Sequence, residues 1–242
     1  MYSLTMGVMI QAENLRKVYR IGNEKVAALA GIDLTIEQGE VCCIVGQSGS
    51  GKSTLLNMLA GLEKPTRGRI TIAGERITEM DEDSLTLFRQ KNLGFIFQSY
   101  NLLPRLTATE NAALPLLFHG VDKTKRNKAA LRELREMGIE NRAHHKPSEM
   151  SGGQQQRVAI ARAFVVRPKV IFADEPTGNL DSETTMTVMQ TMLDRAARFG
   201  ITFVMVTHEP DLSLLCDRTI TLRDGKIISD ERNENKITEE LK

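Results

Sequence analysis

The sequence is poor in cysteine and in long apolar runs. Its 242 residues include three cysteines, two of which, Cys42 and Cys43, are adjacent in an apolar run. Such a set makes no disulfide framework and indicates buried thiols in a reducing cytoplasm. No apolar stretch approaches the roughly 18 residues that a membrane-spanning helix needs. We therefore expect a chain that does not cross a membrane by itself.

An excess of either charge is also missing. Lys and Arg total 32, and Asp and Glu total 31. A protein that binds nucleic acid normally shows a basic excess, so no nucleic-acid partner is expected. The locally basic stretch from Lys123 to Lys146 is interleaved with Glu133, Glu136 and Glu140, which is typical of a solvated amphipathic helix.

The first ten residues lack the basic start of a secretion signal. We expect them to be a short leader before the first strand, with Met9 as an alternative translation start to Met1. At the other end, residues 231–242 form a polar tail.

Short unbroken apolar runs recur along the chain and indicate strands that are buried on both faces, as in a largely parallel sheet. Helical patterns lie between most of them, and several end at a glycine or before a proline. The predicted strands are Val41–Val45, Phe95–Phe97, Val170–Ala173, Ile201–Val206 and Thr219–Leu222. The predicted helices are Ser53–Ala60, Arg126–Met137, Ser151–Val166 and Glu183–Phe199.

This alternation predicts an α/β domain. The N-terminal part has shorter alternating runs, Ile32–Ile36 and Arg69–Ile72, which favour an antiparallel β portion. The middle of the chain, roughly residues 85–160, reads as mostly helical. Near the end, Asp224-Gly225 predicts a hairpin turn. The length suits one well-packed domain with room for a smaller inserted subdomain.

A phosphate-binding loop follows the strand Val41–Val45. The pattern G-x-x-x-x-G-K-[ST] is met by Gly46, Gln47, Ser48, Gly49, Ser50, Gly51, Lys52 and Ser53. Glycines let successive N–H groups curl around phosphate oxygens, and the helix that follows adds positive potential at its N-terminus. Lys52 supplies a charge to the β- and γ-phosphates, Ser53 a ligand for Mg²⁺, and Thr54 a contact to the α-phosphate. An accidental match arises in about one chain in a hundred of this size, so we predict an ATP site.

Polar residues follow three more of the predicted strands. Asp174 and Glu175 come after Val170–Ala173, His208 after the strand that ends near Val206, and Gln98 after Phe95–Phe97. Open α/β sheets bind their ligands at the carboxyl ends of strands. We expect Asp174 to hold Mg²⁺, usually through water, and Glu175, on the opposite side of the extended chain, to act as the general base. His208 is expected to contact the γ-phosphate, and Gln98 to reach Mg²⁺ or the attacking water.

A further motif, Ser151-Gly152-Gly153-Gln154 followed by Gln155-Gln156-Arg157, resembles the signature of ABC ATPases. Together with the phosphate loop, Gln98, Asp174-Glu175 and His208, it appears in the order typical of that family over roughly residues 10–230. The resemblance implies a P-loop ATPase core at 8–87 and 161–230, with a helical signature subdomain at 88–160. It also implies that Tyr19 stacks on adenine.

The resemblance further implies a head-to-tail pair of such chains that encloses two ATP molecules. Each ATP would lie between one chain's phosphate loop and the other chain's signature, whose Ser151 and Gly153 stand at a helix N-terminus. Asp181 resembles the residue that reaches across this dimer. Because both halves of the site are intact in one sequence, a homodimer is favoured.

Longer phrases such as VGQSGSGKSTLLNMLAGLEKPTRG and FADEPTGNLD resemble the lipoprotein-release and macrolide-export subgroup. Its members act at the cytoplasmic face of the membrane on a separate permease with a large extracytoplasmic domain. The segment Ser99–Glu110 is where this family receives the permease. Leu102, Leu103 and Leu106 are candidates for an apolar groove there, or are internal to the helical subdomain.

Two alternatives lie within the wider family. A cell-division relative would use its ATP cycle to activate a cell-wall hydrolase through a membrane partner, without transport. A DNA-repair or translation protein is disfavoured, because the sequence has no long coiled coil, no second cassette, no zinc-binding cysteines and no basic excess.

Overall fold

The computed structural model describes residues 7–178, 180 and 182–234. It divides into two compact units. Unit 1 takes its described residues from 7–86 and 202–234, and unit 2 from 87–201. The predicted subdomain at 88–160 is smaller than unit 2, and its limits stay a prediction. In the part of the chain that is described, no helix is long and apolar enough to cross a membrane.

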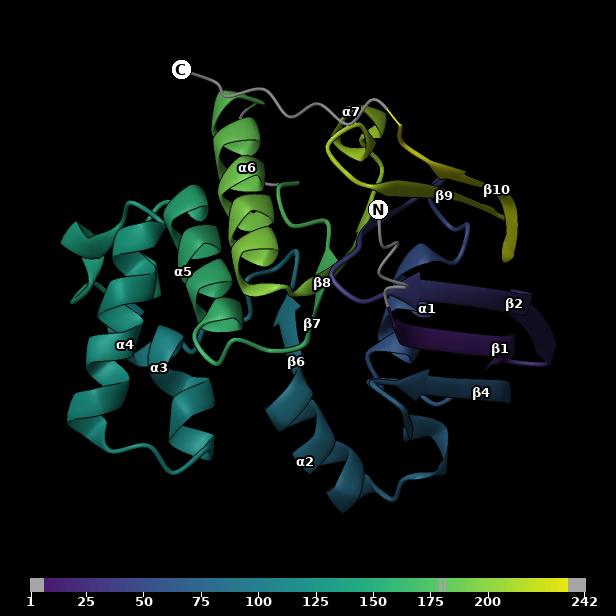
Figure 1. Ribbon diagram of the computed structural model, residues 1–242, viewed down its shortest axis with the longest axis horizontal. Coiled ribbons are helices and arrows are strands. Elements are labelled where there is room, and N and C mark those ends of the chain that lie inside the picture. Colours follow the sequence, from purple (N-terminus) through teal and green to yellow (C-terminus); the bar gives the residue numbers. More distant parts are fainter. Residues whose placement is uncertain (1–6, 179, 181, 235–242) are drawn as a thin grey trace, which may run out of the picture. The chain divides into compact units, whose positions relative to one another are not determined.

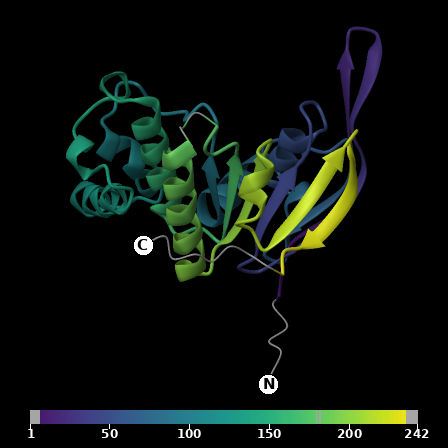
Figure 2. The ribbon, with the colours of Figure 1, turned by 90° about the horizontal axis from the view of Figure 1, so that it is seen from above.

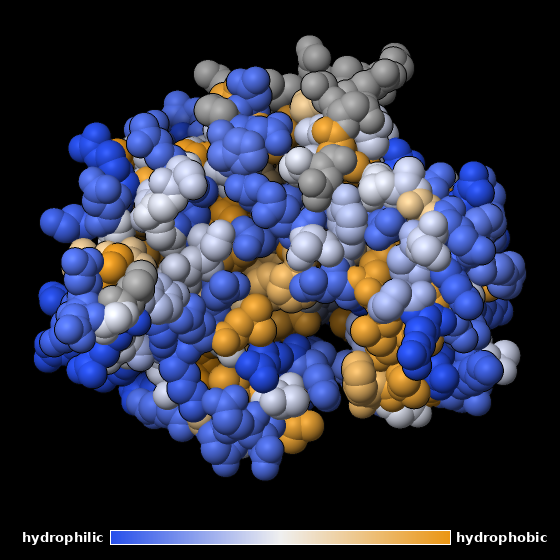
Figure 3. Space-filling view, turned by 180° about the vertical axis from the view of Figure 1, so that it is seen from behind, coloured by the Kyte–Doolittle hydropathy of each residue, from blue (hydrophilic) through white to orange (hydrophobic). Residues whose placement is uncertain are grey.

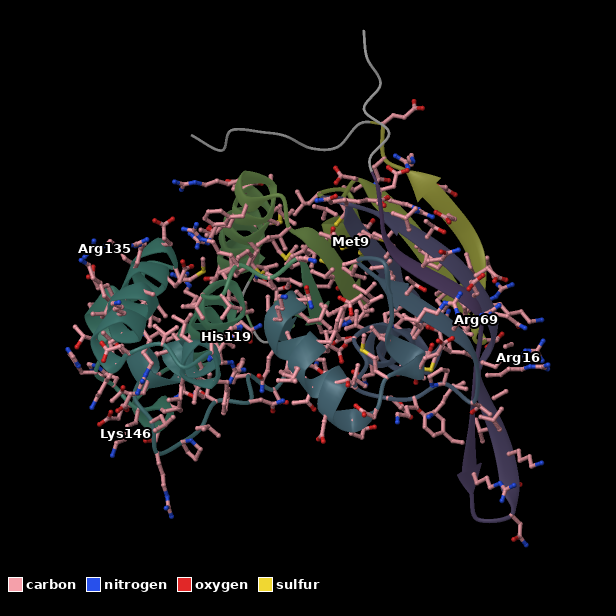
Figure 4. All side chains as sticks on the ribbon, turned by 60° about the horizontal axis from the view of Figure 1, so that its bottom comes forward. Met9, Arg16, Arg69, His119, Arg135 and Lys146 are labelled. Atoms are coloured by element: carbon pink, nitrogen blue, oxygen red, sulfur yellow. The ribbon has the colours of Figure 1, made fainter. Side chains whose placement is uncertain are left out.

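Unit 1 contains the predicted antiparallel β portion, a sheet with strand order β2-β1-β4-β5. Strands β1 (Val8–Ile21) and β2 (Glu24–Glu37) pair along their length and project as a long hairpin (Figure 2), and β4 is Arg67–Ile72. The short β5 (Glu75–Arg76) completes the sheet, and a 3₁₀ turn, Ile77–Glu79, follows it. Met9 on β1, Arg16 near its middle and Arg69 on β4 are labelled in Figure 4. Alternate residues of β2 and β4 are buried, among them Ile32, Leu34 and Ile36 on β2, as expected for a sheet with one covered face.

A second set of strands in unit 1 runs in the order β10-β9-β3-β8. Strand β3 (Val41–Val45) pairs in parallel with β8 (Thr202–Thr207) and with β9 (Arg218–Arg223). Strand β10 (Lys226–Arg232) folds back on β9 through Asp224 and Gly225, whose φ angles of 50° and 70° make the predicted hairpin turn. The helices of this unit are α1 (Lys52–Leu59) and the short α7 (Pro210–Ser213). The predicted strands are confirmed, and β10 extends two residues into the predicted tail.

Unit 2 is mostly helical, as predicted for the middle of the chain (Figure 1). Helix α2 (Glu82–Asn92) leads into it, and β6 (Leu93–Ile96) pairs in parallel with β7 (Val170–Asp174). Its other helices are α3 (Ala108–Phe118), α4 (Lys123–Glu136), α5 (Gly152–Phe164) and α6 (Ser182–Phe199), with 3₁₀ turns at Glu140–Arg142 and Pro147–Glu149. Helices α4 and α6 are followed by glycines with positive φ, Gly138 and Gly200, as the sequence predicts.

The buried core of each unit contains the strands that precede the predicted site residues. Cys42, Cys43 and Cys216 are buried free thiols, in agreement with the predicted burial of the cysteines. Strands β3, β7 and β8 are buried almost throughout, which holds the segments that follow them on a rigid base.

Candidate functional site

In unit 1 the phosphate loop joins β3 to α1. Gly51, with φ 103°, is the residue before the helix and allows the tight entry. The Lys52 ammonium donates hydrogen bonds to the carbonyl oxygens of Gly46 at 2.8 Å and Gln47 at 2.9 Å. This cation therefore lies over the curled loop, as the sequence predicts for a residue that meets phosphate.

Two glycines are required by close backbone approaches. A Cβ atom on Gly46 would lie 2.2 Å from the carbonyl oxygen of Leu222, and one on Gly51 would lie 2.6 Å from that of Ala28. Among the residues that the structure describes, the buried Ser50 hydroxyl has no hydrogen-bond partner. A narrow loop with a buried unpaired donor and a cation fits an oxygen-rich anion.

Tyr19 lies beside the start of α1. Its hydroxyl donates to Glu63 Oε2 at 2.8 Å and lies 3.5 Å from Thr54 Oγ1. The Lys17 ammonium pairs with Glu63 Oε1 at 2.8 Å and lies 5.2 Å from the centre of the Tyr19 ring. Burial raises the pKa of the Tyr19 hydroxyl. Glu63 and Lys17 were missed by sequence reasoning because the Glu63 contact is made across 44 residues.

His208 and the phosphate loop follow neighbouring strands. Val45 of β3 and Thr207 of β8 are paired, so Gly46 and His208 both directly follow paired residues of parallel strands. The prediction that these motifs follow the carboxyl ends of buried strands is confirmed for this pair. The His208 side chain is exposed.

In unit 2, Gln98 and Glu175 meet. Ile96 of β6 and Ala173 of β7 are paired, and the Gln98 amide donates to Glu175 Oε2 at 2.7 Å. Asp174 is the last residue of β7. The sequence predicts that these three residues follow the carboxyl ends of two strands, and the structure adds that the two strands are neighbours.

The predicted backbone of Glu175 is wrong. The sequence predicts that Glu175 lies on an extended chain, but its φ is 45°, in the left-handed region. The Gly178 N–H donates to the Glu175 carbonyl oxygen at 3.2 Å, so the chain turns at Glu175 directly after β7. The turn, rather than strand alternation, therefore sets the direction of this carboxylate.

The signature residues start helix α5. The Ser151 hydroxyl accepts from the Gln154 N–H at 3.3 Å, and the Gln154 side-chain oxygen accepts from the Ser151 N–H at 3.1 Å. This reciprocal cap confirms the predicted helix start. Ser151, Gly153 and Gln154 line an open cavity of about 420 Å³ together with Asn141 and Arg157. Asp181 lies outside the described residues.

A second cavity in unit 2, of about 340 Å³, is mainly apolar. Figure 4 labels His119, which follows α3 and borders it, and Figure 3 shows apolar side chains reaching one face of the molecule in patches. We call this cavity the apolar groove. It is lined by Arg89, Gln90, Leu93, Gly94, Phe95, Phe97, Asn101, Leu114, Pro115, Phe118, His119, Arg162, Ala163 and Val166.

The residues predicted from the sequence for an apolar groove are different ones. None of Leu102, Leu103 and Leu106 lines it, and Leu106 borders a smaller cavity of about 160 Å³ instead. The contribution of the segment Ser99–Glu110 is Asn101. The apolar lining comes from β6, α3 and α5, which are separate in sequence.

The predicted site residues fall into two groups. Unit 1 holds Tyr19, the loop from Gly46 to Thr54 and His208, whereas unit 2 holds Gln98, Asp174, Glu175 and the signature residues. Oxygen donors suited to Mg²⁺ are present in both units, namely the Ser53 hydroxyl, the Gln98 amide and the Asp174 carboxylate.

Comparison with known proteins gives a consistent result. A model of the ABC transporter family matches residues 29–178. MJ1508 of Methanocaldococcus jannaschii, an uncharacterized ABC transporter ATP-binding protein, is 50% identical over 220 residues, covering 91% of this chain and 98% of that protein. The macrolide export ATP-binding/permease protein MacB of Hyphomonas neptunium is 45% identical over 232 residues, covering 96% of this chain and 36% of MacB. The chain thus spans about a third of the MacB length.

A solved structure extends the similarity to three dimensions. It is described as the dimeric structure of a post-hydrolysis state of the ATP-binding cassette MJ0796 bound to ADP and Pi. The TM-score is 0.89 at 42% identity, and the match covers 93% of this chain and 99% of the other.

Proposed function

The chain belongs to the ABC transporter family as one of its ATP-hydrolysing cassettes, and we propose that two copies pair to drive a separate membrane permease. The observation that carries the proposal is the capped start of α5. Ser151 and Gly153 present a helix N-terminus to an open polar cavity, which suits the binding of phosphate oxygens supplied from outside. The dimeric description of MJ0796 supports the pairing.

In the proposed site, the loop from Gly46 to Thr54 holds the ATP phosphates and Lys52 neutralises the β- and γ-phosphates. Ser53, Gln98 and Asp174 would each offer an oxygen ligand to Mg²⁺, which would neutralise charge on the phosphate oxygens. Tyr19 stacks on adenine, with its ring oriented by Glu63 and Lys17.

Hydrolysis in this proposal needs a base and a stabilised transition state. Glu175 polarises the attacking water, and Gln98, hydrogen-bonded to that carboxylate, orients it. His208 contacts the γ-phosphate. Ser151, Gly152, Gly153 and Gln154 of the second chain close the site, with Asp181 at the contact between chains.

The proposed membrane partner is a permease of the lipoprotein-release or macrolide-export type, with a large extracytoplasmic domain. The similarity to MacB, named as an ATP-binding/permease protein, supports this class. We assign the apolar groove to a short helix of that permease, because Leu114, Pro115 and Phe118 offer an apolar surface to such a helix. The chain would then act peripherally at the cytoplasmic face of the membrane, exporting substrate or transmitting force.

Replacing Phe118 with Glu tests the groove, since a carboxylate there would have to be desolvated against the permease helix. With a co-expressed, tagged permease of this type, we expect the wild-type chain to co-purify and the yield of the variant to fall about tenfold or more. Leu87→Glu is the matched control, because Leu87 is 66% exposed and Phe118 65% exposed, but Leu87 does not line the groove. Equal co-purification of the Phe118 and Leu87 variants would contradict the docking site.

A further inference from the structure

Gln156, one turn into helix α5, makes a contact that links the helix of the signature to the turn at Glu175. The side chain is 2% exposed, and its amide donates to the carbonyl oxygen of Pro176 at 2.5 Å. Pro176 directly follows Glu175. A helix that begins at the signature therefore holds the chain one residue after the proposed general base.

The orientation of this amide follows from its partner. The Pro176 carbonyl can only accept, so the NH₂ group of Gln156 must face it. Within the described parts of the chain, Gln156 Oε1 has no hydrogen-bond partner. Burying an amide with one of its polar atoms unpaired is unfavourable relative to burying an apolar side chain. Packing alone would favour Met or Leu here, so the bond to Pro176 is the feature that explains a glutamine.

The turn that Gln156 holds is strained. A non-glycine residue in the left-handed region is unfavourable and persists only where its surroundings fix it. At Glu175 three contacts do so: the Gly178 N–H on its carbonyl oxygen, the Gln98 amide on its carboxylate, and Gln156 on the next carbonyl. Because the φ angle of Pro176 is fixed by its ring, the backbone between Glu175 and the carbonyl that Gln156 contacts has little conformational freedom.

Helix α5 also contacts the segment that directly follows Gln98. Arg162 donates to the carbonyl oxygens of Tyr100 at 2.7 Å and Asn101 at 2.6 Å. Both residues have positive φ and follow Gln98 closely. Helix α5 thus fixes both segments that meet in the Gln98–Glu175 hydrogen bond.

We propose that Gln156 is a positioning residue for the hydrolytic reaction, one that fixes the Glu175 carboxylate through the Pro176 carbonyl. The proposal rests on the proposed role of Glu175 as general base. Ser151 and Gln156 are five residues apart, about 7.5 Å along a helix. A shift of α5 when Ser151 meets the nucleotide of the second chain is thereby passed to the chain's own Glu175, which couples the two ATP sites of the dimer.

The test is the variant Gln156→Met, which keeps side-chain volume and removes the hydrogen bond. We expect kcat to fall about 10–100-fold, as for a small misplacement of a catalytic group, with KM for ATP changed less than about threefold. Gln156→Asn, too short to reach Pro176, should behave in the same way and serves if the Met variant does not fold. Gln190→Met is the control, because the Gln190 amide bonds to Asp194 on the surface of α6.

A double-mutant cycle separates positioning from a general structural role. Once Glu175→Gln has removed the base, Gln156→Met should slow the remaining hydrolysis less than about twofold. An unchanged kcat for Gln156→Met, or the same fold-loss with and without Glu175, would overturn the proposal. If Glu175 is not the general base, the Glu175→Gln variant alone will hydrolyse ATP at the wild-type rate, which is a different result from either of these.

Discussion

Replacing Glu175 with Gln is expected to slow ATP hydrolysis by about 10²–10⁴-fold while ATP binding is retained. The substitution removes the basic carboxylate and keeps its shape. Its amide oxygen can still accept the hydrogen bond that Gln98 donates to Glu175 at 2.7 Å. Binding should persist because the phosphate loop in unit 1 is untouched.

The measurement is steady-state phosphate release beside nucleotide binding by calorimetry. Glu75→Gln, an exposed carboxylate on β5, is the control for the loss of one negative charge and should hydrolyse ATP like wild type. Wild-type turnover of the Glu175 variant would mean that another group activates the water.

Replacing Lys52 with Ala is expected to weaken nucleotide binding itself. A hydrogen bond to a charged group contributes about 1.5–3 kcal/mol, so the dissociation constant for ATP should rise roughly 10–100-fold. In the structure the ammonium already lies over the loop, within 2.9 Å of two of its carbonyl oxygens. The effect should be larger for ATP than for AMP, which lacks the β- and γ-phosphates.

Titration with a fluorescent ATP analogue gives the comparison. Lys125→Ala, on the exposed face of α4, is the matched control and should leave affinity unchanged. An unchanged ATP affinity of the Lys52 variant would remove the basis for a phosphate cradle at this loop.

Features set by neighbouring residues were predictable from the sequence. The strand Val41–Val45, the glycine loop after it and the helix start at Ser151 coincide with the structure, because strand burial, turns and caps depend on a few adjacent residues. The hairpin at Asp224-Gly225 follows the same logic.

Features set by contacts between distant segments were not predictable. The hydrogen bond between Gln156 and Pro176 joins residues that are 20 apart in the sequence, and the one between Tyr19 and Glu63 joins residues that are 44 apart. The apolar groove collects side chains from three elements, which a search for neighbouring leucines in the sequence does not find. The left-handed Glu175 was missed because strand periodicity continues the strand by one residue, whereas hydrogen bonds from Gly178 and Gln98 turn it.

In the proposed dimer a second copy of the chain completes each ATP site, and hydrolysis by a mixture of two inactive variants tests this arrangement. Lys52→Ala disables the phosphate loop, and Ser151→Asp disables the signature by placing a negative charge opposite phosphate while keeping a good helix cap. In a symmetric dimer, a mixed pair joins the intact loop of one chain to the intact signature of the other.

Equal mixing should therefore raise hydrolysis well above that of either variant alone, to at most about a quarter of the wild-type rate, since half of the dimers are mixed and each has one complete site. Hydrolysis that stays at the level of the separate variants at every mixing ratio would contradict a site shared between two chains.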